Sequence, residues 1–370
     1  MNSIFRIGAA VLTAMLFPPS AKSGLAQFDQ ARGYDTGRNP SAVAAADLDG
    51  DGHLDLVVAN SDDATLTLFQ GDGSGRFVQR RVVSAGDKPN DIDLADIDGD
   101  GRIDYAVANH ETSYLTVLLA TDGFGIRATR TITVEAKPHP HVARLVDINE
   151  DGRYDLLTDH RDAEGLLWLP GDGRGDFTSP GKLIPVGGDP YLGLAIADLN
   201  ADGRPELITP NPWHVAVVRN LGSGKFRPPM TLSSRSPFAV ASLDGNGDST
   251  PDLLVASETG RINLLVGSGL GQFADSSAHA QQMAAGAKRI VAGDFDGDGI
   301  GDAAVADFRS SPVLVLAGAG HRFYTTRLEA GANPWGMAAA DLNADGLDDL
   351  VVTDAAGNRM QVFISRRPAR

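Results

Sequence analysis

The chain of 370 residues contains no cysteine. It therefore forms no disulfide bonds and offers no cysteine for lipid attachment. Positive charge is also scarce, since 32 Lys and Arg face 48 Asp and Glu and the formal net charge is −16 at pH 7. No basic stretch with interleaved aromatic residues occurs, so nucleic acid is not an expected partner.

Motifs of common catalytic sites are absent as well. The chain has no Gly-x-Ser-x-Gly elbow, no His-Glu-x-x-His pair and no phosphate-binding Gly-Lys-Ser/Thr loop. Its Gly-rich segments, such as residues 171–175, are typical of turns between adjacent strands. The sequence carries no catalytic signature, and we do not expect an enzyme.

No apolar run near the N-terminus is long enough to cross a membrane. The stretch Ile7 to Phe17 has eleven residues, too few to span a bilayer. Arg6 precedes it and Gly24-Leu25-Ala26 is an acceptable cleavage site before Gln27, so residues 1–26 are predicted to be a signal peptide. We expect a secreted or periplasmic mature chain, residues 27–370, with no membrane span; an uncleaved anchor is the alternative.

What the chain does contain is a short acidic loop that occurs seven times, each time followed by an apolar run. The first copy, Asp47 to Asp55, leads directly into residues 56–59. The copies begin at residues 47, 96, 147, 198, 244, 294 and 341, at intervals of 46 to 51 residues. Such a period over the whole chain predicts one closed repeat array and not two domains.

The residue types in this loop suit calcium. Oxygens at positions 1, 3 and 5 of a tight turn point to one centre, position 7 offers its backbone carbonyl, and an acid at position 9 closes the cage. Glycine at position 6 permits the chain to reverse. We therefore expect up to seven Ca²⁺ ions, one per repeat. Positions 1, 3, 5, 7 and 9 of the seven loops are Asp47, Asp49, Asp51, His53 and Asp55; Asp96, Asp98, Asp100, Arg102 and Asp104; Asp147, Asn149, Asp151, Arg153 and Asp155; Asp198, Asn200, Asp202, Arg204 and Glu206; Asp244, Asn246, Asp248, Thr250 and Asp252; Asp294, Asp296, Asp298, Ile300 and Asp302; and Asp341, Asn343, Asp345, Leu347 and Asp349.

The fifth loop is recognised by alignment on a proline. In several repeats a proline lies seven residues before position 1, and counting from Pro237 makes Asp244 the first ligand. Ser249 then replaces the glycine at position 6. We expect this loop to be the most strained and to bind calcium most weakly.

An EF-hand and an ordinary acidic turn are the two alternatives to this calcium loop. An EF-hand requires a Glu at position 12 and flanking helices, but position 12 is Val or Thr within β-rich runs, so EF-hands are excluded. In an ordinary acidic turn, Asp would only cap backbone amides. Positions 1, 3, 5 and 9 hold 24 of the 48 acidic residues, so the acidity serves the loops and does not indicate a basic partner.

Each period contains four short runs with β character. In the second repeat these runs are 91–95, 104–109, 114–120 and 128–134. Four antiparallel strands make one propeller blade, so the expected fold is an all-β seven-bladed β-propeller. The chain stops after the third strand of the seventh repeat, and we expect Phe28 to Tyr34 to supply the missing fourth strand.

The repeat resembles the FG-GAP/VCBS family, which includes the seven-bladed head of integrin α subunits. The resemblance covers essentially all of residues 27–370, and the calcium loop is its most specific element. It departs locally: Arg127 replaces the Phe that follows the Gly-rich turn, Glu206 replaces Asp, and Ser249 replaces Gly. The resemblance implies that the calcium loop joins the first and second strands on a lower face, and that ligands bind on the upper face.

The upper-face loops link successive blades or join the second and third strands of a blade. Aromatic residues, amides and mixed charges concentrate there, as expected of a binding surface. Five histidines fall in loops of repeats two to four, where they could form a transition-metal site or an acid–base centre; scattered surface histidines are the alternative. The candidate ligand-binding residues are His110, His139, His141, His160, Tyr191, Trp213, His214 and Trp335.

Three functions agree with the sequence. The first is a binding or adhesion module whose upper face engages a glycan or a protein. The second is a polysaccharide lyase or hydrolase that uses the histidine-rich loops. The third is a purely structural, envelope-associated protein. We favour the binding module, and the sequence indicates neither its ligand nor its oligomeric state.

Overall fold

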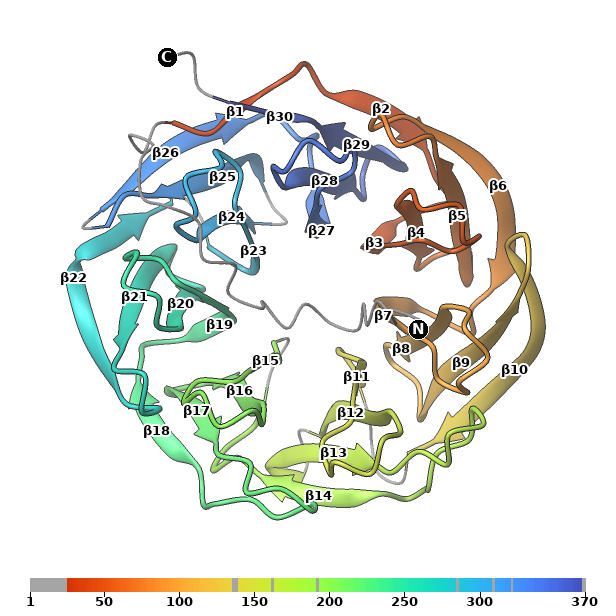
Figure 1. Ribbon diagram of the computed structural model, residues 1–370, viewed down its shortest axis with the longest axis horizontal. Coiled ribbons are helices and arrows are strands. Elements are labelled where there is room, and N and C mark those ends of the chain that lie inside the picture. Colours follow the sequence, from red (N-terminus) through yellow and green to blue (C-terminus); the bar gives the residue numbers. More distant parts are fainter. Residues whose placement is uncertain are drawn as a thin grey trace, which may run out of the picture.

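The computed structural model describes residues 25–134, 139–160, 163–190, 193–283, 286–307, 310–320 and 322–367. These residues form seven four-stranded antiparallel sheets, arranged as blades around a central axis (Figure 1). The fold is therefore the seven-bladed β-propeller that the repeat period predicts. The first strand of each blade faces the axis, and the fourth strand lies at the rim (Figure 1).

The first three blades are built from consecutive strands, which are β3 (Pro40–Ala46), β4 (Asp55–Asn60), β5 (Thr65–Gly71) and β6 (Phe77–Ser84); β7 (Pro89–Ala95), β8 (Asp104–Asn109), β9 (Tyr114–Thr121) and β10 (Gly125–Thr133); and β11 (Arg144–Val146), β12 (Asp155–His160), β13 (Gly165–Leu169) and β14 (Lys182–Pro185). The strands expected in the second repeat are confirmed, with β10 beginning three residues earlier than its run.

The next three blades are β15 (Ala195–Ala197), β16 (Glu206–Asn211), β17 (His214–Val218) and β18 (Met230–Ser233); β19 (Pro237–Leu243), β20 (Asp252–Ser257), β21 (Arg261–Gly267) and β22 (Phe273–Gln282); and β23 (Arg289–Gly293), β24 (Asp302–Asp307), β25 (Ser310–Gly318) and β26 (Phe323–Leu328). The seventh blade combines β27 (Pro334–Ala340), β28 (Asp349–Asp354) and β29 (Arg359–Phe363) with β2 (Arg32–Asp35).

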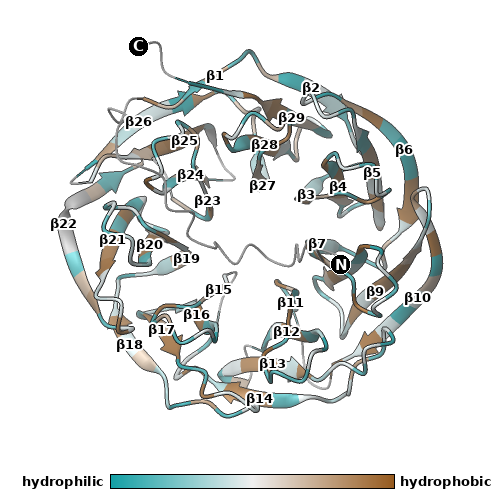
Figure 2. Cartoon of the chain, in the orientation of Figure 1, coloured by the Kyte–Doolittle hydropathy of each residue, from teal (hydrophilic) through white to brown (hydrophobic). Residues whose placement is uncertain are grey.

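The second strand is the most deeply buried strand of the blade. In six blades all six of its residues are buried, because neighbouring blades cover both faces of the sheet. Apolar runs such as Leu56 to Ala59 follow from this two-sided burial. Rim strands are less buried, and β10 alternates mainly between half-buried and exposed residues. Figure 2 shows apolar colours frequently in the inner strands and polar colours in the loops.

The hydrophobic core is divided among the interfaces between blades. Leu68 of β5 packs in one cluster with Leu94 of β7, which joins blades one and two. Six further clusters of described residues join the other neighbouring pairs in the same way. The ring therefore depends on every interface, including the one between blades seven and one.

The N-terminal segment closes the ring, as the sequence predicts. β2 pairs with β29, while the short strand β1 (Gln27–Phe28) pairs with β30 (Ser365–Arg366). The closing segment is thus split into two strands, and it extends to Asp35. Phe28 lies against Phe363, with ring centroids 6.4 Å apart. Both ends of the array are held in adjacent pairings without a covalent link.

The predicted signal peptide falls mainly on residues 1–24, which lie outside the described residues. Ala26 is already part of the fold: it is 2 % exposed, and Thr326 Oγ1 donates a hydrogen bond of 2.9 Å to its carbonyl oxygen. Cleavage directly before Gln27 would remove this buried residue. In the described part of the chain, no helix reaches the length and apolarity needed to cross a bilayer.

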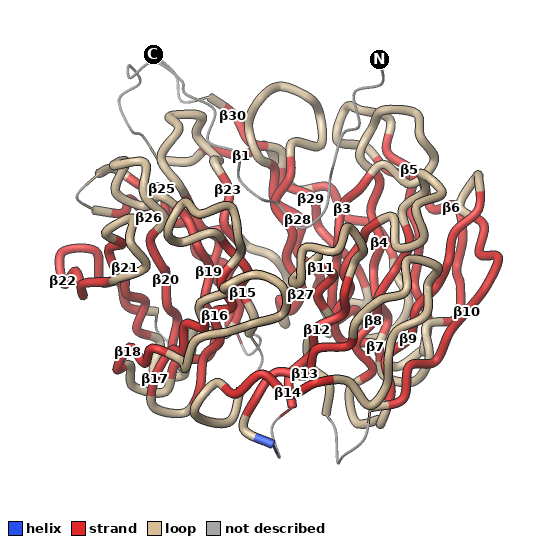
Figure 3. Tube along the Cα trace, turned by 60° about the horizontal axis from the view of Figure 1, so that its bottom comes forward, coloured by secondary structure: helices blue, strands red, loops and turns tan. Residues whose placement is uncertain are grey.

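The loops lie at the two ends of the strands (Figure 3). We call one end the lower face, where the first strand turns into the second and the third into the fourth. The upper face carries the loops that join the second and third strands and those that lead to the next blade. The acidic loops therefore lie on the lower face, and the histidine and tryptophan candidates belong to the upper-face segments.

Candidate functional site

Every acidic loop begins directly after a first strand and ends on the first residue of a second strand. Position 9 is that last residue, for example Asp55 of β4 and Asp104 of β8. All seven acids at position 9 are at most 1 % exposed. Burying a carboxylate is costly unless it is hydrogen-bonded or paired with a cation, so its partners decide what the loop can hold.

The acid at position 9 connects two turns of the lower face. Asp55 Oδ2 accepts a hydrogen bond of 2.8 Å from the backbone N–H of Leu48, at position 2 of the same loop. Its Oδ1 accepts a second bond of 2.8 Å from the N–H of Gly71, at the end of β5. Four other blades repeat both bonds. In blade three, Asp155 accepts instead from the Asn149 side chain and from Gly171.

The acids at positions 1, 3 and 5 cap backbone amides within the loop. The two oxygens of Asp47 accept bonds from Gly50 (2.7 Å) and Gly52 (3.0 Å), and Asp51 accepts one of 2.8 Å from His53. These bonds account for part of the acidic composition, as the alternative of a capped turn requires. Each carboxylate oxygen has a second lone pair, so capping leaves acceptor capacity for a cation.

Positions 1, 3 and 9 bring their oxygens together. In blades one, two and six, one oxygen from each of the three carboxylates lies within 4.8 Å of the others. Ca²⁺–oxygen distances of 2.3–2.6 Å place ligand oxygens at such separations around one ion. The three groups are Asp47, Asp49 and Asp55; Asp96, Asp98 and Asp104; and Asp294, Asp296 and Asp302. The other four loops have Asn at position 3, whose amide oxygen is also a calcium ligand.

Burial, and after it the neighbouring carboxylates, raise the pKa of the acid at position 9. Burial raises the pKa of Asp55 to about 6, and repulsion from Asp49 and Asp51 adds to it, although two backbone N–H groups oppose the shift. The same causes raise the pKa of Glu206 and of Asp349 to about 7. A bound cation would offset both burial and repulsion, so the loop favours a positive charge at its centre.

Two positions of the loop adopt left-handed backbone conformations. At position 6 the glycines have φ between 81° and 89°, and Ser249 of the fifth loop has φ 66°. A side chain in this region is strained, but this does not distinguish the fifth loop as the most strained, because the third, fourth and seventh loops each have one such non-glycine residue at position 4. Position 4 is also left-handed in every loop, and its residues include Glu150 (φ 64°) and Ala201 (φ 56°). Sequence reasoning missed this second position because glycine occupies it in only four loops.

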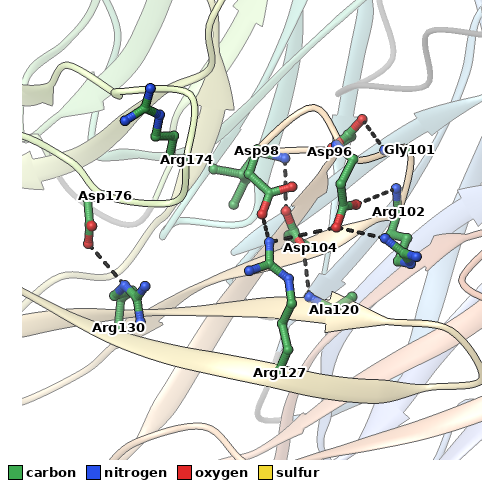
Figure 4. A network of polar contacts seen from close by, with 12 residues as sticks. Asp96, Asp98, Gly101, Arg102, Asp104, Ala120, Arg127, Arg130, Arg174 and Asp176 are labelled. Atoms are coloured by element: carbon green, nitrogen blue, oxygen red, sulfur yellow. Dashed lines mark hydrogen bonds and ion pairs between the residues drawn. The ribbon is translucent and has the colours of Figure 1, made fainter.

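The second loop contains a cation from its own chain. Arg127 of β10 contacts Asp98 and lies 3.7 Å from Asp100, so its guanidinium enters the acidic cluster (Figure 4). Arg102 forms ion pairs with Asp100 (2.8 Å) and Asp122 (2.7 Å). Phe124, three residues before Arg127, is buried in the core. The departure from the expected Phe at residue 127 thus places a positive charge beside the loop.

The upper face exposes one large aromatic side chain prominently. Trp213, in the tight turn between β16 and β17, is 74 % exposed. Trp335 of β27 is half-buried, and the guanidinium of Arg289 lies 5.9 Å from its ring centroid. His214 is half-buried at the start of β17. Tyr191, another candidate, lies outside the described residues.

The structure brings three of the five candidate histidines together. The ring centroid of His110 lies 5.3 Å from that of His139 and 4.9 Å from that of His141. His141 is buried, and its Nδ1 lies 2.6 Å from Oδ2 of Asp159. His160 follows Asp159 at the end of β12, whereas His214 belongs to blade four. The sequence indicated the region, but not which histidines meet.

A comparison with protein families finds matches to the FG-GAP-like repeat. The matched segments are residues 47–107, 96–158, 147–209, 198–255 and 244–305. Together they span more than half of the chain. Each segment runs from the start of one acidic loop to the apolar run after the next. No curated protein matches the sequence significantly.

Solved structures with the same fold differ widely in sequence. Two structures of BBS1N in complex with ARL6DN, soaked with mercury and with lead, superpose with TM-scores of 0.66 and 0.62 at 12 % and 13 % identity. They cover 94 % of this chain and 99 % and 98 % of their own. A lectin from Agrocybe aegerita that recognises non-reducing terminal N-acetylglucosamine has a TM-score of 0.55 at 19 % identity, covering 84 % of this chain and 92 % of its own.

Proposed function

The chain belongs to the FG-GAP-like repeat family, and from this premise we propose that it is a calcium-stabilised propeller that binds a glycan or a protein on its upper face. The calcium ions, up to one per blade, hold the lower-face turns. The upper face, whose loops differ from blade to blade, carries the recognition. A β-propeller built from FG-GAP repeats is consistent with a binding module. The sequence contains none of the catalytic motifs named above.

Support for calcium comes from the convergence of the carboxylates at positions 1, 3 and 9. Three such groups occur at the same place in different blades, and each includes a buried acid. Calcium would neutralise this charge and would join the acidic loop to the turn after the third strand, because position 9 contacts both. Arg127 already places a positive charge beside the carboxylates of the second loop. This loop should therefore gain least from a bound calcium ion.

The observation that carries the binding role is the exposure of Trp213. An indole that is 74 % exposed in a two-residue turn offers a large apolar surface to a partner, and tryptophan is frequent at the centres of interfaces. The related folds support both ligand classes, since BBS1N is complexed with ARL6DN and the lectin recognises N-acetylglucosamine. We extend the proposal to the location as well: the leader directs the chain to the periplasm or the exterior.

Replacement of the exposed indole tests the binding role. A glycan array and an affinity capture against envelope and extracellular proteins are performed with the calcium-loaded protein and with Trp213→Ala. The matched control is Leu270→Ala, since Leu270 is 73 % exposed but lies in a lower-face turn. Loss of a ligand in Trp213→Ala alone supports the proposal, and the array and the capture distinguish glycan from protein. Equal binding by all three proteins contradicts it.

A further inference from the structure

The three histidines on the upper face form a compact group across two blades. His110 follows β8 of blade two, while His139 and His141 lie in the segment that leads into β11 of blade three. Their ring centroids are 4.9, 5.3 and 6.3 Å apart. We infer that His110, His139 and His141 form a site for a transition-metal ion, with zinc as the best match, and that Asp159 positions His141 for coordination.

The spacing of the rings agrees with coordination by nitrogen. In a tetrahedral zinc site, Zn–N bonds of 2.0–2.1 Å place the centres of neighbouring imidazole rings roughly 5 Å apart. Two of the three separations are close to this value. The ring nitrogens of the three residues do not all lie within 4.8 Å of one another as the rings stand, so His110 and His139 must turn for three nitrogens to meet at one ion. His139 is exposed and His110 half-buried, so the rings that must adjust lie on the solvent side. Three protein ligands leave a fourth position for water or a ligand.

Asp159 gives the site its orientation. Its Oδ1 accepts hydrogen bonds from the backbone N–H of His141 (2.7 Å) and of Val142 (3.1 Å), which fix the carboxylate in place. Its Oδ2 holds Nδ1 of His141 at 2.6 Å. A carboxylate on one imidazole nitrogen sets the tautomer and makes the other nitrogen the coordinating atom, which is the arrangement common behind metal-bound histidines.

The residue types of the group suit a transition metal. Neutral imidazole is the form that binds metal. The ligand types also separate this site from the lower-face loops, since imidazole suits zinc and oxygen clusters suit calcium. The inference is independent of the proposed upper-face ligand.

Metal titration of the tag-free protein, kept in excess calcium so that the acidic loops are saturated, tests the site. Zn²⁺ is titrated calorimetrically, and Co²⁺ is followed by the visible absorption that tetrahedral nitrogen coordination intensifies. One tight equivalent is expected. His110→Ala/His139→Ala, which changes only exposed or half-buried residues, should abolish it, and His214→Ala on blade four should leave it intact. Circular dichroism confirms that the variants are folded.

Asp159→Asn separates the positioning role from direct coordination. We expect it to lower zinc affinity about 10- to 100-fold, with one equivalent still bound at saturation. The absence of tight binding in the calcium-loaded protein, or unchanged binding in His110→Ala/His139→Ala, would overturn the site. Unchanged affinity in Asp159→Asn would overturn the role of Asp159.

Discussion

The two faces of the propeller differ in how far their contacts repeat from blade to blade. On the lower face the same contact recurs, because a buried acid at position 9 accepts backbone hydrogen bonds from two turns in blade after blade. On the upper side, the residue six positions before each acidic loop differs in every blade for which the structure describes it. This residue is Ser41, Asn90, His141, Phe238, Lys288 or Trp335.

The difference separates a structural task from specific ones. Every blade carries a buried acid at position 9, and in five blades it accepts the same pair of backbone hydrogen bonds. The variable upper residues make contacts that suit one interface only: Asn90 Nδ2 donates to the carbonyl of His141 (2.9 Å), whereas the Lys288 ammonium lies 4.6 Å from the centroid of the Phe238 ring. Repetition therefore marks what holds the ring, and variation marks where recognition can evolve.

Loss of one lower-face acid should have the largest effect of a single substitution. Asp55→Ala leaves the buried N–H groups of Leu48 and Gly71 without their acceptor. We expect it to lower the free energy of unfolding by about 3 kcal/mol, even in metal-free protein, because each orphaned buried group costs roughly 1–3 kcal/mol. Denaturant unfolding of the chelated protein measures it.

An upper-face acid provides the control for that comparison. Asp62 forms an ion pair of 2.9 Å with Lys88, and both side chains are largely exposed. Asp62→Ala should therefore cost less than about 1 kcal/mol. Similar losses in the two variants would mean that the lower-face contacts have no special weight.

The pH should change the contribution of calcium. Because burial raises the pKa of Asp55 and Asp104 to about 6, the metal-free folded state binds more protons than the unfolded state between about pH 4 and 6. Its stability from these groups rises as the pH falls through that window. Protons and calcium compete for the same oxygens, so calcium should stabilise much less at pH 5 than at pH 7.5.

Thermal unfolding of chelated, dialysed protein with and without added Ca²⁺ at the two pH values measures this difference. An increment from calcium that is the same at pH 5 and at pH 7.5 would contradict the assignment of the buried acids as its ligands. The exposed ion pair between Arg38 and Asp63 lies on the upper face. We do not expect it to contribute to the pH dependence of the calcium effect.

The smallest effect is expected at the strained position of the fifth loop. Ser249 has φ 66°, where glycines stand in the other loops. Ser249→Gly should stabilise the protein by about 0.5 kcal/mol, since relief of roughly 1–2 kcal/mol of strain is partly offset by glycine entropy. The reverse change, Gly52→Ser in the first loop, should destabilise. Chemical denaturation compares them, and equal signs for both changes would exclude backbone strain as the cause.

The sequence predicts most of the ring and part of its sites. A period near 49 residues and a missing fourth strand lead directly to seven blades and to closure by the N-terminus, because each repeat forms the same four strands and the same lower-face loop. Arg127 beside Asp98, and Asp159 behind His141, leave no such pattern. Each contact lies within one blade and depends on a residue, Arg127 or Asp159, that the other repeats do not carry at that position, so no repeating pattern in the sequence reveals it.

Chelation tests the central claim, that calcium on the lower face holds the ring, most directly. The melting temperature of the protein is measured with Ca²⁺, with EDTA, and with EDTA followed by excess Ca²⁺ or Mg²⁺. Ions that bind only the folded state stabilise it by about 2.7 kcal/mol per site at a concentration a hundredfold above Kd. We predict a large fall with EDTA that Ca²⁺ reverses and Mg²⁺ does not; a melting temperature indifferent to EDTA would contradict the claim.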